Sequence, residues 1–102
     1  MAWKDVIELG EMIEDVIHYE TVKSWSYRKV HANRKSVRQS EVYQASAVGL
    51  KPELMFEIHT IDYSQEERIK YNTKVYEIIR VFEKGEVTEL VVSAFIGSDV
   101  DG

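Results

Sequence analysis

The sequence predicts a mainly β fold: a small β-barrel of five to six strands with one short helix, at about residues 37–48, in a long connecting segment. The strongest indication is a C-terminal hairpin, because residues 74–83 and 87–96 are rich in β-branched and aromatic side chains and flank a turn around Gly85. A second indication is the alternation of apolar and polar side chains over residues 54–59, which is typical of a half-buried strand. Closure into a barrel would also remove exposed strand edges.

The N-terminal third is predicted to hold two strands with a loop between them. Residues 6–9 form a short extended segment that Gly10 ends, and residues 11–20 are expected to be a loop that leads into the next strand. Residues 21–35 have the β-branched and aromatic content of a long strand. The period-two alternation slips after Tyr27, which indicates a bulge.

A helix is predicted to begin at Ser36, because Ser36 and Gln39 have the spacing of a capping box. Gly49 is the expected C-terminal cap, and Pro52 prevents continuation. A helix this short is marginal alone, so it must dock on the barrel or on another subunit. The docking side is a narrow apolar stripe at helical spacing, made by Tyr43, Ala47 and Leu50.

The chain is expected to be one domain, residues 1–102, since no repeat or linker divides it and two cores would be too small at this length. Residues 71–74 predict a tight turn, because Asn72 tolerates positive φ. Residues 97–102 are polar and are expected to form a disordered tail.

The charged residues are unevenly distributed. The formal net charge is −5, yet residues 21–40 contain no acid. They contain six bases: Lys23, Arg28, Lys29, Arg34, Lys35 and Arg38. This basic run is compatible with a solvated face, with a surface that meets an acidic patch on a neighbouring copy or partner, and with phosphate binding.

No residue pattern indicates an enzyme, a metal or a cofactor. The absence of cysteine excludes disulfides and thiolate chemistry, and no serine lies in a glycine-flanked elbow. His18, His31 and His59 do not have the spacing of a ligand pair, and the five glycines occur singly. No apolar run approaches the roughly 20 residues that span a bilayer. The expectation is a soluble binding or assembly protein that is made in a cytosol.

Several stretches of the chain resemble the head-closure, or head-tail adaptor, proteins of tailed bacteriophages. The first is the run at residues 30–45, VHANRKSVRQSEVYQA, continued by residues 49–53 and 56–58. The second, residues 69–80, is similar to the hairpin that precedes the last two strands in that family. Residues 10–20 depart from the family, whose members often have a glycine-centred turn there.

The resemblance implies a structural protein of the virion neck, from a phage or an integrated prophage. Such proteins have a small β-barrel with a short helix and assemble as a ring, typically twelvefold, on the adaptor ring beneath the portal. They retain packaged DNA without reading its sequence and present a docking surface for the tail. The implied partners are the portal-adaptor ring, a tail-side completion protein and further copies of the chain. Assembly would take place in the host cytoplasm.

An interface is predicted around the basic run and the helix, at Arg34, Lys35, Arg38, Glu41, Tyr43 and Ala47. The bases are expected to pair with acids on an adjacent subunit or adaptor, and the two helix residues to form the docking stripe. By position, residues 36–52 match the inserted element that reaches toward the channel or the neighbouring ring in the family. Two alternatives remain: another neck ring, such as a tail-completion protein, and a small nucleic-acid-binding module that uses the basic run at residues 23–38.

Overall fold

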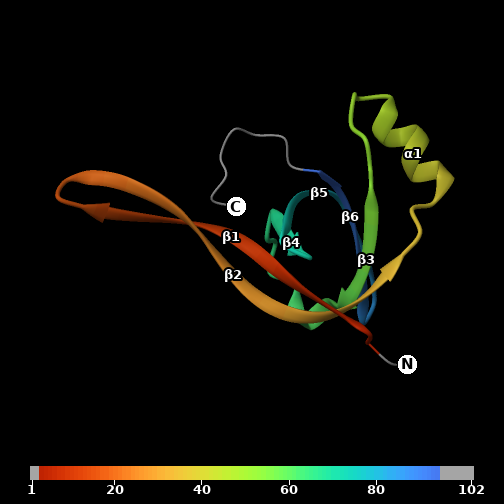
Figure 1. Ribbon diagram of the computed structural model, residues 1–102, viewed down its shortest axis with the longest axis horizontal. Coiled ribbons are helices and arrows are strands. Elements are labelled where there is room, and N and C mark those ends of the chain that lie inside the picture. The colour runs from red at the N-terminus through yellow and green to blue at the C-terminus, as the bar shows by residue number, and fades with distance from the viewer. Residues whose placement is uncertain (1–2, 95–102) are drawn as a thin grey trace.

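The structure is a computed structural model that describes residues 3–94. Over these residues it confirms the predicted class, since it is a closed antiparallel β-barrel with one short α-helix (Figure 1). The elements in chain order are β1 (Asp5–Ile17), β2 (Glu20–Lys35), α1 (Gln39–Ser46), β3 (Leu54–His59), the 3-10 turn η1 (Thr60–Asp62), β4 (Arg68–Tyr71), β5 (Lys74–Lys84) and β6 (Val87–Ala94). Around the barrel the strand order is β1-β2-β3-β6-β5-β4, and pairing of β4 with β1 closes it.

The core is the interior of the barrel, and all six strands contribute to it. Its buried members are Ile7, Leu9, Val30, Ala32, Phe56, Ile58, Ile69, Tyr76, Leu90 and Val92. None of them belongs to α1. Each fully buried aliphatic or aromatic side chain of this kind contributes about 1.5–3 kcal/mol. The barrel therefore has a complete core of its own, and α1 is an addition to its outer surface.

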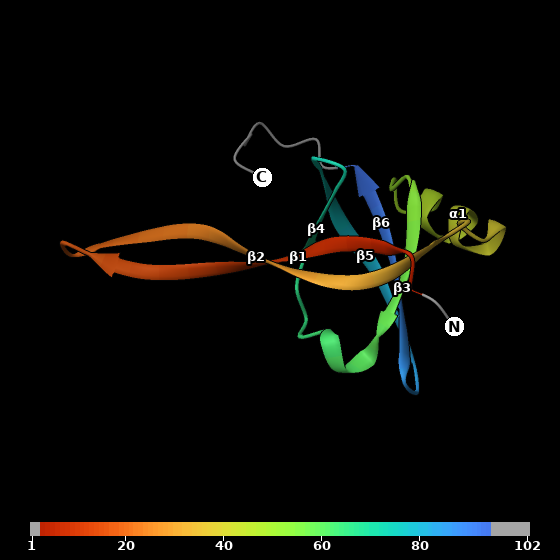
Figure 2. The ribbon, with the colours of Figure 1, turned by 60° about the horizontal axis from the view of Figure 1, so that its bottom comes forward.

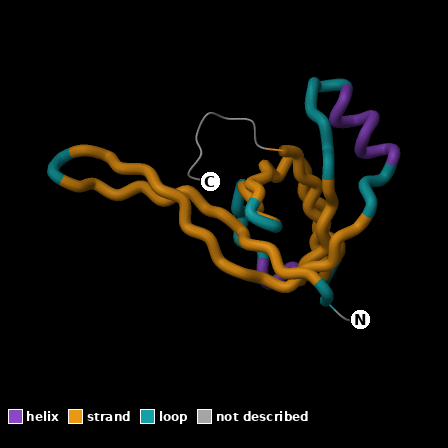
Figure 3. Tube along the Cα trace, in the orientation of Figure 1, coloured by secondary structure: helices purple, strands orange, loops and turns teal. Residues whose placement is uncertain are grey.

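β1 and β2 continue well beyond the barrel, and their far ends form a projecting hairpin, called here the hairpin arm (residues 11–26) (Figures 1 and 2). β4 pairs with β1 only at residues 8–10, and β3 pairs with β2 only at residues 32–35. The arm therefore has no third strand. Figure 3 shows it as two extended segments joined by a short turn, and it makes the molecule 47 Å long.

The predicted end of the first strand at Gly10 and the predicted loop at residues 11–20 are both wrong. Gly10 lies inside β1, directly opposite Tyr27 of β2. A Cβ atom at this position would lie 2.6 Å from Cε1 of Tyr27. The glycine thus admits the tyrosine ring against the strand rather than ending it. The β-branched residues that follow then continue the extended backbone.

Two-residue turns join three of the hairpins. His18 and Tyr19, at the tip of the arm, have φ of 52° and 67°, the conformation of a type I′ turn. Asn72 and Thr73 have φ of 50° and 65°, which confirms the tight turn predicted at residues 71–74. Gly85 has φ of 69° in the turn between β5 and β6, which confirms the C-terminal hairpin.

The bulge predicted in β2 is wrong, because its pairing with β1 is uninterrupted from residue 20 to residue 32. The alternation slips after Tyr27 because β2 passes there from the arm, where both of its sides meet solvent, into the barrel, where Val30 and Ala32 face the core. The irregularity lies instead in β5, between Ile78 and Arg80. The predicted last two residues of the C-terminal strand and the predicted tail at residues 97–102 lie outside the described residues.

α1 begins later than predicted, so the helix is shorter than residues 37–48. The chain stays extended through Arg38, whose φ and ψ are −70° and 147°. Arg38 is the N-cap residue and makes no side-chain capping hydrogen bond, so the capping box predicted from Ser36 and Gln39 is wrong. An ion pair from Arg38 to Glu89 of β6 holds this connection along the barrel instead.

The predicted C-terminal end of the helix is confirmed at Gly49, which has φ of 80°. The backbone N–H of Leu50 donates to the carbonyl of Ala45 at 2.9 Å, and that of Gly49 to the carbonyl of Ser46 at 3.1 Å. These two bonds form a Schellman motif, which satisfies carbonyls that the helix end would otherwise leave open.

Candidate functional site

A group of charged residues on the outer face of the barrel, called here the Glu89 cluster, fastens the connection before α1. Glu89 is only 1% exposed. Its Oε1 lies 2.9 Å from Nη2 of Arg38, and its Oε2 lies 3.4 Å from Nζ of Lys84 and 3.8 Å from Nζ of Lys35. Nζ of Lys35 is also 3.3 Å from Oε2 of Glu57. Three cations therefore surround one buried carboxylate.

α1 docks on the same face of the barrel through Glu41 and Ala45, its two buried residues. Oε1 of Glu41 lies 2.9 Å from Nε of Arg80 on β5, and Oε2 lies 4.0 Å from Nη2 of Arg38. The guanidinium groups of Arg38 and Arg80 lie over the ring of Phe82, at 5.8 Å and 4.9 Å from its centroid. Polar contacts therefore hold the helix on the barrel.

These contacts change how the predicted interface charges are understood. Lys35, Arg38 and Glu41 each have partners of opposite charge within the chain. The Lys35 and Arg38 side chains remain 42% exposed, so contact with a partner protein stays a prediction for both. Their charges are already offset inside the subunit, which weakens their attraction for acids elsewhere.

The ion pair with Arg38, with help from Lys84, lowers the pKa of Glu89 below its ordinary value of 4.5, although burial opposes the shift. A carboxyl with a lowered pKa binds its proton more weakly in the folded state than in the unfolded state. Its contribution to stability is therefore present above about pH 4.5 and lost as the pH falls through the folded pKa.

We expect Glu89→Gln to lower the free energy of unfolding by about 1–2 kcal/mol at neutral pH, because the charge-assisted bonds are lost. Well below pH 4.5 the variant and the native chain should differ much less, since both then carry a neutral side chain. Urea unfolding at both pH values measures the two differences. Glu86→Gln, at an exposed turn, is the matched control and should change neither value. An equal loss at both pH values would contradict the assigned ion pair.

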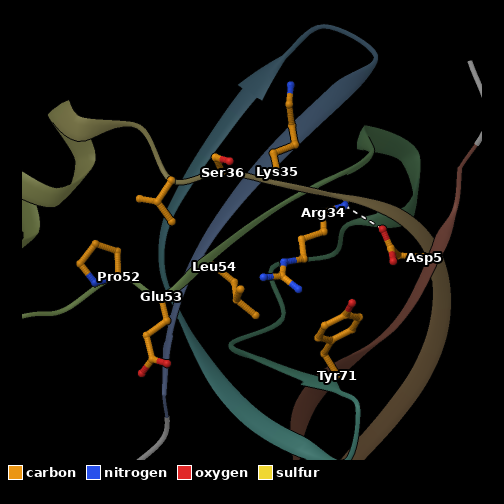
Figure 4. Close-up of a pocket in the computed structure, with 9 residues that line it drawn as sticks. Asp5, Arg34, Lys35, Ser36, Pro52, Glu53, Leu54 and Tyr71 are labelled. Atoms are coloured by element: carbon orange, nitrogen blue, oxygen red, sulfur yellow. Dashed lines mark hydrogen bonds between the residues drawn. The ribbon is translucent and has the colours of Figure 1, made fainter.

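A second feature is the barrel-mouth pocket, a cavity of about 600 Å³ where β2 ends and β3 begins. Its apolar wall is made by Val37, Pro52, Leu54 and Tyr71. Figure 4 shows the guanidinium of Arg34 in the hollow between Leu54 and Tyr71. Among the described residues this guanidinium has no carboxylate partner. It is the one member of the predicted interface whose charge is left uncompensated within residues 3–94.

Two carboxylates also lie in the wall of the barrel-mouth pocket, and backbone groups engage both. Asp5 accepts a hydrogen bond from the backbone N–H of Arg34 at 3.0 Å. Glu53 accepts one from the backbone N–H of Ala94 at 3.3 Å. The pocket wall is therefore mostly polar, with a smaller apolar part that includes the ring of Tyr71, and among the described residues Arg34 is its one cation without a carboxylate partner.

The basic run does not form one continuous patch. Alternate residues of a strand point to opposite sides. Arg28 and Arg34 lie on the side of β2 that carries the core residue Val30, whereas Lys29 and Lys35 lie on the outer side. The cluster of bases in the sequence is thus divided between two faces of the strand.

The other end of the barrel interior is closed by Glu66, a buried carboxylate that sequence reasoning missed. Its Oε2 accepts hydrogen bonds from Nε and Nη2 of Arg28, at 3.1 Å and 2.8 Å, and its Oε1 accepts one from the backbone N–H of Ser64 at 2.8 Å. Arg28 therefore has a structural role. No local sequence signal marks this pair, since its members are 38 residues apart.

The predicted docking stripe of α1 faces solvent. Tyr43 is 68% exposed, and Ala47 and Leu50 are exposed beside it. This stripe lies on the side of the helix opposite to Glu41 and Ala45, which face the barrel. The stripe therefore does not dock the helix on the barrel, and its contact with another protein stays a prediction.

The hairpin arm is a further exposed surface, which was not predicted from the local residue pattern. Cross-strand pairing places three aliphatic residues on one side, Ile13, Ile17 and Val22. Four acids accompany them along the arm: Glu11, Glu14, Asp15 and Glu20. At the tip, the side chain of Tyr19 is fully exposed. The arm is thus an acidic element with exposed apolar side chains.

Within residues 3–94, no group of three or more histidine, aspartate or glutamate side chains is placed to hold a metal ion. Over the same part of the chain, no helix has the length and apolar character needed to cross a membrane. The chain matches no model of a known protein family, and no curated protein matches its sequence. The likeness to head-closure proteins is therefore carried by the residue runs alone.

Proposed function

We propose that this protein is a non-enzymatic structural component of the head-tail connector of a tailed bacteriophage. It forms a ring on the portal-adaptor complex, closes the DNA-filled head and provides the surface on which the tail docks. The observation that carries the proposal is the presence of two projecting elements on different sides of one closed barrel, the hairpin arm and the segment with α1 (Figure 1).

A ring requires two different surfaces on every subunit, because each copy meets its two neighbours through unlike contacts. Here the arm and the helix both expose apolar side chains, including Tyr19 and Tyr43, while the barrel core is complete without them. Exposed aromatic residues of this kind are typical anchors of protein interfaces.

The resemblance to head-closure proteins supports the same function. Its first run, residues 30–45, spans the end of β2 and most of α1, and its second, residues 69–80, spans the hairpin of β4 and β5. The first run includes Arg34 at the barrel mouth and Tyr43 on the exposed stripe. The first run therefore includes two residues whose side chains are available to a partner, beside others that belong to the core.

Nucleic-acid binding through the basic run has less support. The bases lie on two faces of β2, and Arg28, Lys35 and Arg38 are paired with carboxylates of the same chain. A protein that follows a phosphate backbone needs an uncompensated stripe of cations. Contact with packaged DNA in the proposed ring is therefore not sequence-specific.

Electron microscopy of purified portal-adaptor complexes, with and without this protein, tests the proposal. We expect an additional ring that narrows the channel when the protein is present. No added density, with the protein shown to be folded, would contradict the connector assignment. Density on tails instead of portals would identify a tail-completion ring.

A further inference from the structure

We propose that the tip of the hairpin arm of one copy occupies the barrel-mouth pocket of the next copy. Tyr19 packs against the apolar part of the pocket wall, and Glu20 beside it pairs with Arg34. This inference deepens the proposed ring, on which it rests, by naming the two surfaces that join neighbouring subunits.

The arm requires a partner to be stable along its length. A two-stranded hairpin is marginal by itself in water, and the arm has no third strand. Both of its outer edges present unpaired backbone groups, a form of surface that proteins normally cover. The exposed aliphatic side chains and the fully exposed Tyr19 add apolar area that gains free energy on burial.

The barrel-mouth pocket matches the chemistry of the arm tip. Its volume of about 600 Å³ lies in the range of cavities that hold ligand-sized groups, which leaves ample room for an aromatic side chain. Leu54 and Tyr71 offer an apolar and an aromatic surface to such a ring. Arg34 supplies a cation that lacks a carboxylate among the described residues, and the arm supplies acids. The tip and the pocket therefore match at two places: the apolar part of the wall can receive Tyr19, and Arg34 can receive an acid of the arm.

The positions of the two surfaces favour contacts that repeat from one copy to the next over a two-fold dimer. The arm points away from the end of the barrel where β2 meets β3 (Figures 1 and 2). A contact between an arm and a mouth is thus a head-to-tail contact, and such contacts repeat until the rotation closes a ring. A two-fold dimer would require one surface to match itself, whereas arms with four acids each repel one another.

Disulfide trapping tests this contact directly, because the chain has no cysteine of its own. Tyr19→Cys and Pro52→Cys each introduce a single thiol, one on the arm and one in the pocket. We expect a mixture of the two concentrated variants, under mild oxidation, to form the heterodimer several-fold in excess of either homodimer. Mass spectrometry under non-reducing conditions measures the three products.

Tyr19→Cys mixed with Glu86→Cys is the matched control, because Glu86 lies on an exposed turn outside the pocket, and it should give only background heterodimer. A statistical mixture of products from the first pair would overturn the inference. Excess homodimer of Tyr19→Cys would also overturn it and would show that arms pair with arms.

Charge reversal provides a second readout. Arg34→Glu in the Pro52→Cys chain should lower the heterodimer yield about tenfold, the effect of losing roughly 1.4 kcal/mol. Glu20→Arg in the Tyr19→Cys chain should restore it. Failure of the second reversal to rescue would overturn the assigned ion pair. A higher yield after removal of residues 95–102 would identify those residues as the occupant of the pocket.

The outcomes for this contact and for the proposed function are separate. If the cysteine variants form a ring on the connector but no disulfide between positions 19 and 52, the contact is rejected and the proposed function is not affected. If the disulfide forms efficiently in the free protein but the protein never binds portal-adaptor complexes, the contact is supported and the proposed function is rejected.

Discussion

Replacement of residues 14–23 by an Asn-Gly turn is expected to abolish incorporation of the protein into the connector ring and to leave the barrel folded. Ile13 and Ser24 are directly paired in the same phase of the ladder as Ile17 and Glu20, which flank the present turn, so a two-residue type I′ turn can join them without a change in register. Every residue removed is exposed, and none belongs to the core. The free energy of unfolding should therefore change by no more than about 1 kcal/mol.

Two measurements are needed to interpret the shortened arm. Urea unfolding reports the barrel, and binding to portal-adaptor complexes, imaged by electron microscopy, reports assembly. The same Asn-Gly turn placed at residues 85–86 is the control, because it shortens nothing and lies far from the arm; it should assemble normally. Normal assembly of the shortened chain would show that the arm is dispensable and would refute its role between neighbours.

The second large effect is expected from Phe56→Ala, which should lower the free energy of unfolding by about 3–5 kcal/mol. Phe56 is fully buried at the centre of the barrel, and its ring meets the edge of Tyr71 with centroids 5.0 Å apart. Small domains have about 5–15 kcal/mol of stability in total, so this loss is about a fifth of it or more. Because Tyr71 also lines the barrel-mouth pocket, the cavity should in addition loosen the pocket.

Ile58→Val separates the two consequences of Phe56→Ala. Ile58 is equally buried on the same strand but does not line the pocket. Ile58→Val should lower the free energy of unfolding by about 0.5–1.5 kcal/mol and leave disulfide trapping between positions 19 and 52 unchanged. Phe56→Ala is expected to reduce trapping even at temperatures where it remains folded, as monitored by circular dichroism. Unchanged trapping would show that Tyr71 keeps its place without Phe56.

The barrel was predictable because its strands carry a strong local signal. The alternation over residues 54–59 and the β-rich segments around Gly85 both appear as strands, and Gly49 ends the helix as expected. The hairpin arm was missed because glycine is read as a strand breaker, whereas Gly10 has a long-range partner. Only the structure reveals that Tyr27 packs onto it from 17 residues away. A local pattern contains no information on such a contact.

The charged residues were harder to interpret than the strands. Arg34, Lys35 and Arg38 appear equivalent in the sequence, yet the structure separates them. Lys35 and Arg38 turn to the outer face, where Glu89 lies, while Arg34 points into the barrel mouth. Glu89 is buried on the outer side of β6, where the side chains of Arg38, Lys84 and Lys35 surround it, which no alternation pattern in β6 itself indicates. The structure therefore selects Arg34 as the predicted base with a free charge.

The acids on the hairpin arm also bear on what happens between synthesis and assembly. A bare strand edge is a template for indiscriminate pairing, the first step toward aggregation. Free copies that approach edge to edge bring like charges together within the roughly 8 Å over which charges act at physiological ionic strength. Random stacking of arms is thus suppressed, and a site that offers a cation instead is preferred. The arm has no third strand to cover its edges, but its acids repel the arms of other copies and so disfavour pairing with the wrong partner.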